Sequence, residues 1–352
     1  MDKILPCLEG TVAREDNVSI HYEVYENKSG CDDGSAEPRQ KVLMIMGLAA
    51  SRDGWQPQIT DLLSTIPDPR IDICIFDNRG IGKSSAPEHK AQYSTVIMAE
   101  DAIAVVDALG WKRFHLVGFS MGGMISMKLA ALFPDRLLSL SLLGATEGGW
   151  QSLPKSWRAF KYAIKMAMAS SLEERSKMDI KFHYSKKTLQ EEVNGPGRLR
   201  RDCLYEEYLE EKANCDEQSK SGLNGQMHAC WHHGMTNKEY AKIQSSQIPM
   251  VVIHGRQDLV AVARYGQRIA SKLGAKFVEV DGGHLINREC AHDVSHELLR
   301  IINDKASQVE RKKHLDKAAH SSQSSQSNET GQLPVGMALE QSTEILKPSK
   351  TV

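Results

Sequence analysis

The chain has 352 residues, of which 41% are hydrophobic and 25% charged, a composition typical of a soluble globular protein with a sizeable buried core. Its 44 basic and 45 acidic residues leave a formal net charge of −1, which excludes a global field that recruits nucleic acid or an anionic membrane. A small molecule is therefore the expected partner, and the sequence does not predict an oligomeric state.

The ends of the chain and its cysteines favour a cytoplasmic location. The seven cysteines are scattered without a CxxC pair, as expected of reduced thiols. The start, MDKILPCLEGTVARED, lacks a signal-peptide apolar stretch and is too acidic for a transit peptide. No apolar run reaches the ~20 residues that span a bilayer, and the final KPSKTV matches no retrieval or prenylation signal. We expect a cytoplasmic protein without a transmembrane segment.

The first half of the chain alternates between two patterns. VSIHYEVYE (18–26) predicts a strand that forms a hairpin with GTVARED before it, and a polar loop (27–40) follows. Short apolar runs then predict strands covered on both faces, with helical segments between them, at 41–47, 70–77, 113–119 and 137–145. This alternation predicts an α/β protein with a mainly parallel central sheet and helices on both faces.

The alternation breaks between residues 150 and 245, where amphipathic charged segments contain little that predicts a strand. We interpret 150–245 as a helical cap or lid inserted into a core made of 1–149 and 246–303. Its Met and aromatic residues at 157–168 are interpreted as packing residues. Strands resume at 248–255 and 275–280. Polar, low-complexity sequence predicts a disordered tail over 304–352, in which MALEQSTEIL has the pattern of a transient helix.

One serine lies in a glycine-rich turn between a predicted strand and a predicted helix. GFSMG (118–122) satisfies G-x-S-x-G, a pattern that is informative in this strand–turn–helix context. A turn this sharp strains the backbone of Ser120 and directs its hydroxyl above the carboxyl edge of the sheet. The amides at the start of the following helix point to the same place and suit a developing oxyanion. The alternative is a serine that caps a helix.

A serine hydroxyl becomes a strong nucleophile when a base removes its proton and an acid orients that base. VVIHGRQDLV places Asp258 just past a buried strand, and FVEVDGGHLI places His284 past the next one. Both therefore reach the sheet edge that carries Ser120, and the chain order Ser120, Asp258, His284 is that of one serine-hydrolase arrangement.

Together these motifs resemble the α/β-hydrolase fold over residues 10–303. FDNRGIGKS (76–84) is similar to the family's D-x-R-G-x-G-x-S turn, and MGLAASRDGW (46–55) occupies the position of its His-Gly oxyanion loop, with Met46 in place of the usual His. The resemblance implies an oxyanion hole formed by the backbone amides of Leu48 and Met121. It also implies no cofactor.

Other residues are candidates for the same roles. Asp281 and Glu147 are alternative acids, because each follows a predicted strand. His254 is expected to make a structural hydrogen bond at a strand end, and Asp77 and Arg79 are expected in a turn and in ion pairs. HACWHHG (228–234) concentrates histidines, but its spacing provides no second group of ligands, so we expect a helix there and no metal site.

These features predict a serine hydrolase that attacks an ester-like or other activated carbonyl of a small molecule. A serine at the turn, in place of aspartate, argues against epoxide-hydrolase or dehalogenase chemistry. The alternatives left open are other triad chemistry on this fold (a C–C bond hydrolase, a lyase or a perhydrolase) and a hydrolase-like small-molecule receptor. The acyl and leaving groups are not predicted.

Overall fold

The computed structural model describes residues 4–26, 39–65, 70–193, 195, 197–214 and 218–304. The predicted tail from 305 onward, with its candidate helix, and the loop over 27–38 lie outside the described residues. The described cysteines, Cys7, Cys74, Cys203, Cys230 and Cys290, are free thiols, as expected.

The centre of the molecule is an eight-stranded sheet in the order β1-β2-β4-β3-β5-β6-β7-β8. β1 and β2 form the predicted antiparallel hairpin, and β2 also runs antiparallel to β4. The remaining strands, β3 to β8, are parallel to one another. The strands are β1 (Leu8–Ala13), β2 (Ser19–Glu26), β3 (Gln40–Ile45), β4 (Ile71–Phe76), β5 (Phe114–Phe119), β6 (Leu137–Leu143), β7 (Met250–Gly255) and β8 (Lys276–Val280).

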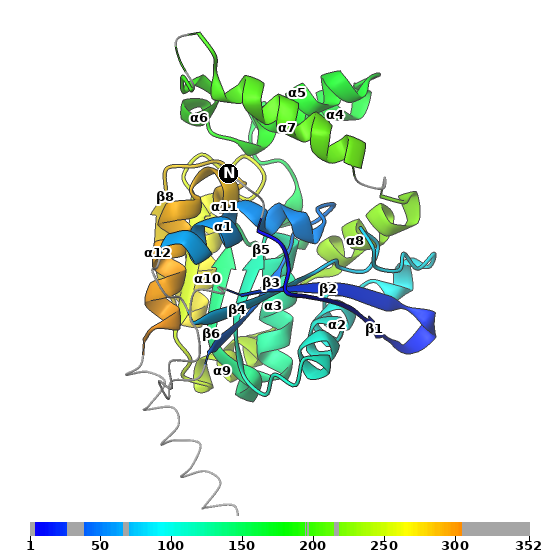
Figure 1. The fold of residues 1–352 in the computed structure, drawn as a ribbon, viewed down its shortest axis with the longest axis vertical. Coiled ribbons are helices and arrows are strands. Elements are labelled where there is room, and N and C mark those ends of the chain that lie inside the picture. The colour runs from blue at the N-terminus through cyan, green and yellow to red at the C-terminus, as the bar shows by residue number, and fades with distance from the viewer. Residues whose placement is uncertain are drawn as a thin grey trace, which may run out of the picture. The chain divides into compact units, whose positions relative to one another are not determined.

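Helices cover both faces of this sheet (Figure 1). α1, α11 and α12 pack on one face, and α2, α3, α9 and α10 on the other. The α-helices are α1 (Gln56–Thr65), α2 (Thr95–Ala108), α3 (Met121–Leu132), α4 (Trp157–Met168), α5 (Leu172–His183), α6 (Lys186–Gln190), α7 (Arg200–Asn214), α8 (Lys220–His232), α9 (Asn237–Ser245), α10 (Ala263–Leu273), α11 (Ile286–Glu289) and α12 (Ala291–Ile302). The predicted α/β class and mainly parallel sheet are confirmed.

Burial on both faces explains why the central strands are continuously apolar in sequence. In β3, Leu43 and Ile45 belong to the hydrophobic cluster under α2 and α3, whereas Val42 and Met44 belong to the cluster under α1 and α12. Successive side chains of a strand point to opposite faces, so both sets must be apolar. The sheet is therefore sandwiched between two cores and holds its carboxyl edge rigidly.

The helices between β6 and β7 divide into two sets. α8 and α9 contribute Cys230 and Ile243 to the core cluster on the sheet. The second set, called here the α4–α7 group (residues 157–214), packs mainly on itself around Ile180, Tyr184 and Leu189, and Figure 1 shows it in green, apart from the helices that cover the sheet.

The expected packing role of the Met and aromatic residues at 157–168 is wrong for three of the five, whereas Tyr162 and Met166 are half-buried. Trp157, Phe160 and Met168 are exposed to solvent, and Ala159 occupies the buried face. The amphipathic periodicity predicted the helix correctly, but it did not indicate that the apolar side of the helix would be exposed to solvent.

Candidate active site

Ser120 lies at the sharp turn between β5 and α3. Its backbone has φ +54° and ψ −116°, a conformation that costs a non-glycine residue about 1–3 kcal/mol. Hydrogen bonds hold it in place: the Ser120 amide donates to the Leu143 carbonyl at 2.8 Å, and the Gly123 amide donates to the Ser120 carbonyl at 2.9 Å. The surrounding strands and helix thus impose the strained turn that the glycine pattern predicted.

Two glycines allow this turn to pack against the sheet. A Cβ at Gly122 would lie 2.0 Å from the Ile45 carbonyl oxygen, and one at Gly118 would lie 2.3 Å from Ser126 Oγ. Any side chain at Gly122 would therefore push α3 away from β3 and displace Ser120.

β7 and β8 bring Asp258 and His284 to the serine. His284 Nε2 lies 3.1 Å from Ser120 Oγ, and His284 Nδ1 lies 2.7 Å from Asp258 Oδ2. His284 and Asp258 are both buried. The structure thus brings together the three predicted side chains in the order carboxylate, imidazole and hydroxyl.

Asp258 is kept in its charged form by its surroundings. Its Oδ1 accepts the amides of Val260 and Ala261, each at 2.8 Å. Burial by itself would raise the pKa of Asp258, but the adjacent His284 and His254 outweigh burial and lower that pKa below its ordinary value. A carboxylate that stays ionised can orient the imidazole and stabilise its protonated form.

His254 takes the predicted structural position at the end of β7. Its Nε2 lies 2.6 Å from the Ala261 carbonyl oxygen and 3.5 Å from Asp258 Oδ2. The ring is fully buried, so it supports the Asp258 loop from beneath.

The loop after β3 approaches Ser120 from the other side. Met121 is the first residue of α3, where the amides have no intrahelical partner, and Leu48 lines the cavity in front of Ser120. The loop is fixed by side chains from elsewhere: the Ala49 amide donates to Gln226 Oε1 at 3.0 Å, and Asn78 Nδ2 donates to the Met46 carbonyl at 2.9 Å. The carbonyl of Met46 and its buried side chain thus anchor the loop.

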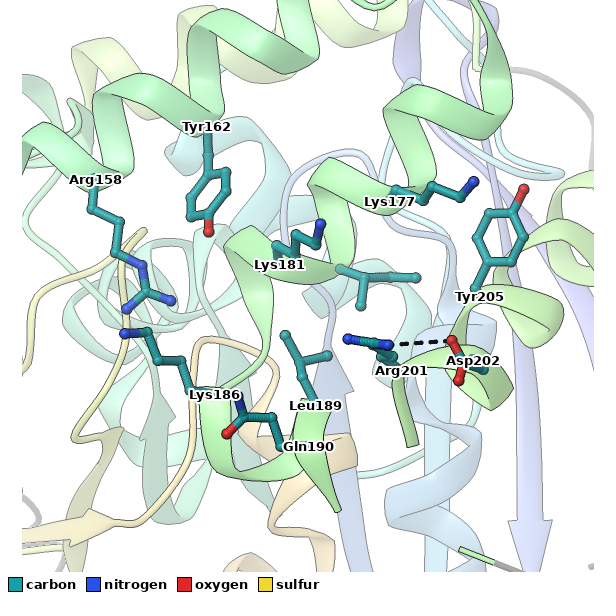
Figure 2. A pocket seen from close by; sticks show the side chains of 11 residues that line it. Arg158, Tyr162, Lys177, Lys181, Lys186, Leu189, Gln190, Arg201, Asp202 and Tyr205 are labelled. Atoms are coloured by element: carbon teal, nitrogen blue, oxygen red, sulfur yellow. Dashed lines mark ion pairs between the residues drawn. The ribbon is translucent and has the colours of Figure 1, made fainter. Parts of the chain in front are cut away.

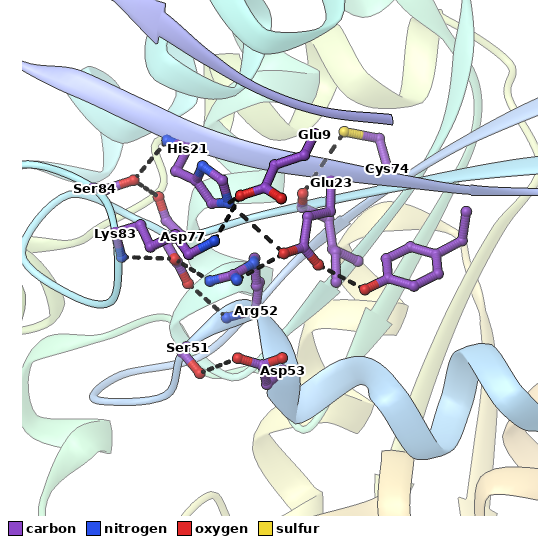
Figure 3. Close-up of polar contacts among 12 residues, drawn as sticks. Glu9, His21, Glu23, Ser51, Arg52, Asp53, Cys74, Asp77, Lys83 and Ser84 are labelled. Atoms are coloured by element: carbon purple, nitrogen blue, oxygen red, sulfur yellow. Dashed lines mark hydrogen bonds and ion pairs between the residues drawn. The ribbon is translucent and has the colours of Figure 1, made fainter. Parts of the chain in front are cut away.

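A buried ion-pair network supports the base of this loop (Figure 3). Arg52 lies between two carboxylates, at 2.6 Å from Asp77 and 2.7 Å from Glu23. Asp77 also accepts the backbone amides of Arg52 and Lys83, at 2.8 and 3.0 Å. Glu23 is buried, which would raise its pKa, but its hydrogen bonds from Arg52 and Tyr25 outweigh burial and lower that pKa. Asp77 is therefore a structural residue, in the turn that was expected.

Glu9, His21 and Glu23 come close enough together to suggest a metal site. Lys83 already pairs with Glu9 at 2.6 Å, and Arg52 with Glu23. These ion pairs account for the cluster without a bound cation.

The other candidate residues are engaged elsewhere. Arg79 makes an ion pair with Asp101 at 2.7 Å. Asp281 is exposed and pairs with Lys187 at 2.9 Å. Glu147 accepts from Tyr240 Oη at 2.8 Å and from Lys272. Asp258, and not Asp281 or Glu147, is thus the acid in contact with His284.

The histidine-rich segment 228–234 is mostly the end of α8, as expected. His233 Nδ1 lies 3.0 Å from Thr95 Oγ1, and burial lowers the pKa of His233 to about 3. The rings of His228 and His232 stack with centroids 4.0 Å apart. These contacts hold the C-terminal end of α8 against α2.

Sequence reasoning missed His183, at the end of α5. Its ring centroid lies 5.9 Å from that of His284, and its carbonyl accepts the His284 amide at 2.6 Å. Burial would lower the pKa of His183, but Asp179 and Asp258 outweigh burial and raise it. The only signal for His183 in the sequence was weak: Asp179 lies four residues earlier on the same predicted helix, so the two side chains would be neighbours.

A cavity of about 540 Å³ opens in front of Ser120. Its walls come from the 46–54 loop, from β-strand ends and from the α4–α7 group, which contributes Ile180, His183, Leu204 and Tyr208. Such a volume fits a small organic molecule.

A family model described as the alpha/beta hydrolase fold matches residues 41–289. A Variovorax paradoxus protein provisionally named carbamate hydrolase RutD is 34% identical over 157 residues, covering 45% of this chain and 52% of the relative. A relative of the same name from Pseudomonas savastanoi pv. phaseolicola is 28% identical over 249 residues, covering 70% and 87%.

The chain thus spans about half or less of the length of the first curated relatives that it matches. Among solved structures, the enol-lactonase from Burkholderia xenovorans LB400 superposes with a TM-score of 0.63 at 20% identity, covering 84% of this chain and all of that one. This likeness concerns the fold. Because the family model matches residues 41–289, from β3 to α11, the chain belongs to the alpha/beta hydrolase fold family.

Proposed function

We propose that the protein is a serine hydrolase that acts on an ester-like or other activated carbonyl of a small molecule. The observation that carries this proposal is the continuous line of contacts from Asp258 through His284 to Ser120, at 2.7 and 3.1 Å. Relatives named as carbamate hydrolases support hydrolysis and make a carbamate a candidate substrate.

In the proposed reaction, Ser120 Oγ attacks the carbonyl carbon while His284 Nε2 takes the hydroxyl proton. The amides of Leu48 and Met121 donate to the resulting oxyanion; losing one such donor typically lowers the rate about 10²–10³-fold. His284 returns the proton to the leaving group, and an acyl-Ser120 ester remains. Water, deprotonated by His284, then releases the acid and restores the serine. These steps need no cofactor.

We further propose that the α4–α7 group is the functional part of the predicted cap, because its side chains line the cavity in front of Ser120. The predicted boundaries at 150 and 245 and the cytoplasmic location remain predictions.

Labelling with a fluorophosphonate probe, followed by peptide mass spectrometry, tests the nucleophile. We expect the label on Ser120 and its loss in Ser120→Ala, whereas Ser126→Ala, a buried serine of the same helix, keeps it. A label on another residue, or undiminished labelling of Ser120→Ala, contradicts the proposal.

Graded p-nitrophenyl esters and aryl carbamates then test the reaction. We expect turnover of at least one series. Labelling of Ser120 without turnover of either series contradicts the proposed reaction and favours the alternatives: a C–C bond hydrolase, a lyase, a perhydrolase or a receptor.

A further inference from the structure

α4 presents an apolar stripe to solvent. Trp157, Phe160, Ile164 and Met168 are 78%, 46%, 40% and 77% exposed. Their spacing of three or four residues puts all four on one side of the helix. Ala159, on the opposite side, is fully buried. The helix therefore packs through the side that carries Ala159, Tyr162 and Met166, the last two half-buried, while the apolar stripe faces outward.

The segments next to α4 in the sequence add further exposed apolar side chains. Trp150, Leu153 and Leu172 are also exposed, and Trp150 stacks edge-on against Trp231 with ring centroids 5.4 Å apart. Exposed apolar side chains that gather in one segment mark an interaction site more often than scattered ones do.

The charged residues in and around α4 are all positive. Residues 148–172 contain Lys155, Arg158, Lys161 and Lys165 and no aspartate or glutamate, although the whole chain is nearly neutral. Lys161 and Lys165 are exposed, and neither forms an ion pair with any residue that the structure describes. On the helix they flank the apolar stripe along one side.

The cations continue into a second cavity, of about 380 Å³, between α4, α5, α6 and α7. Figure 2 shows Arg158 and Tyr162 reaching into it from α4, with Lys186 nearby. Lys181 and Lys186 form no ion pair within the described part of the chain, and Asp202, 3.4 Å from Arg201, is the acidic residue of the lining. Lys177 of the same lining pairs with Glu173 at 2.9 Å, so Lys181 and Lys186 are the lining lysines without an ion pair among the described residues.

We propose that α4 docks the protein on an anionic lipid surface. Trp157, Phe160, Ile164 and Met168 insert among the lipids, and Lys161 and Lys165 contact the acidic headgroups. A helix with large apolar residues on one face and lysine or arginine beside them binds in the plane of a membrane interface, and tryptophan prefers that depth. The binding is peripheral, because no helix among the described residues is long and apolar enough to cross a bilayer.

Charge complementarity favours a lipid surface over a second copy of this chain. Two copies joined through α4 would bring their lysines together without a carboxylate from residues 148–172. A leaflet rich in anionic lipid instead supplies the missing negative charge, and each cation lost should weaken binding about fivefold.

Co-sedimentation of the full chain with vesicles tests the proposal. The vesicles are phosphatidylcholine alone or phosphatidylcholine mixed with phosphatidylserine, at low and high salt. We expect binding to the mixed vesicles that weakens with salt, a loss of about tenfold or more in the double variant Lys161→Glu, Lys165→Glu, and a similar loss in Phe160→Ser. Leu132→Ser, which removes a similarly exposed leucine from the end of α3, is the matched control and should bind as the wild type does.

Three outcomes would overturn the proposal. The wild type does not bind the mixed vesicles, Phe160→Ser binds unchanged, or sedimentation shows a dimer that Phe160→Ser dissociates, which assigns the stripe to a second copy. Thermal unfolding of every variant checks that a loss of binding does not come from misfolding.

Discussion

The sheet and the α4–α7 group treat their apolar residues in opposite ways. All residues of β4 and β5 are buried, and their apolar side chains belong to the clusters on either face. In α4, by contrast, four large apolar side chains are exposed: Trp157, Phe160, Ile164 and Met168. The difference separates two tasks in the proposals made above: the sheet fixes the site residues in space, and the α4–α7 group provides a surface for binding.

The proposed chemistry depends on the first region. Ser120, Asp258 and His284 follow β5, β7 and β8, three strands that cannot move without disturbing both cores. The cavity wall, by contrast, includes residues of the α4–α7 group, which packs on a small cluster of its own. Four predictions test this division.

The largest effect is expected at the imidazole. His284→Ala should lower kcat/KM for a small ester by about 10⁶-fold, because the serine then has no base. His292→Ala, an exposed histidine of α12, should retain wild-type activity in the same assay. Comparable activity in the two variants would contradict the role of His284 as the base.

The second-largest effect is expected for the stability of the fold, in the variant Gly122→Ala. The added Cβ would collide with the Ile45 carbonyl, so we expect the free energy of unfolding to fall by about 3 kcal/mol. Gly234→Ala, where a Cβ would have no atom within 4 Å, is the control and should change it by about 0.5 kcal/mol or less. Urea titration measures both, and equal stabilities would contradict close packing of α3 on β3.

Acid should destabilise the sheet through the buried His115. Burial lowers the pKa of His115 from 6.5 to about 3. As the pH falls below 6.5 the unfolded chain binds the proton first, so the stability from neutral His115 is complete above that pH and is lost progressively toward pH 3.

Between pH 7 and pH 5 this loss should reach about 2 kcal/mol. His115→Asn should shrink the measured difference between the two pH values by that amount. His89→Asn, at an exposed position, should leave the difference unchanged.

The smallest effect is expected in α4. Trp157→Ser should change the free energy of unfolding by about 0.5 kcal/mol or less, since the side chain is largely exposed. The fully buried Trp55 is the counterpart, and Trp55→Ala should cost about 3–5 kcal/mol. Thermal unfolding that ranks Trp157 with Trp55 would show that the apolar stripe is part of a core.

Local patterns predicted the parts of the molecule that depend on neighbouring residues. Continuous apolar runs indicated the buried strands, and their carboxyl ends indicated where Ser120, Asp258 and His284 would lie. In parallel strands that edge is shared, so the spacing along the chain need not be known.

The contacts that sequence reasoning missed join segments far apart in the chain. Gln226 on α8 contacts Ala49, and His183 on α5 contacts His284. Helical periodicity gives a helix and its apolar side, but which neighbour that side meets depends on how the helices pack. For the same reason the outward stripe of α4 was not foreseen.

The joint between α5 and the His284 loop has a consequence for protein engineering. The His183 carbonyl accepts hydrogen bonds from the amides of both His284 and Leu285. A chimera that exchanges only the helices over the cavity therefore replaces one partner of these two hydrogen bonds and keeps the other. A donor segment with a different α5 end would shift the imidazole as well as the pocket wall. Under the proposed mechanism, a change in substrate range would therefore also change the reaction rate, and a graft should carry both the α5 end and the His284 loop.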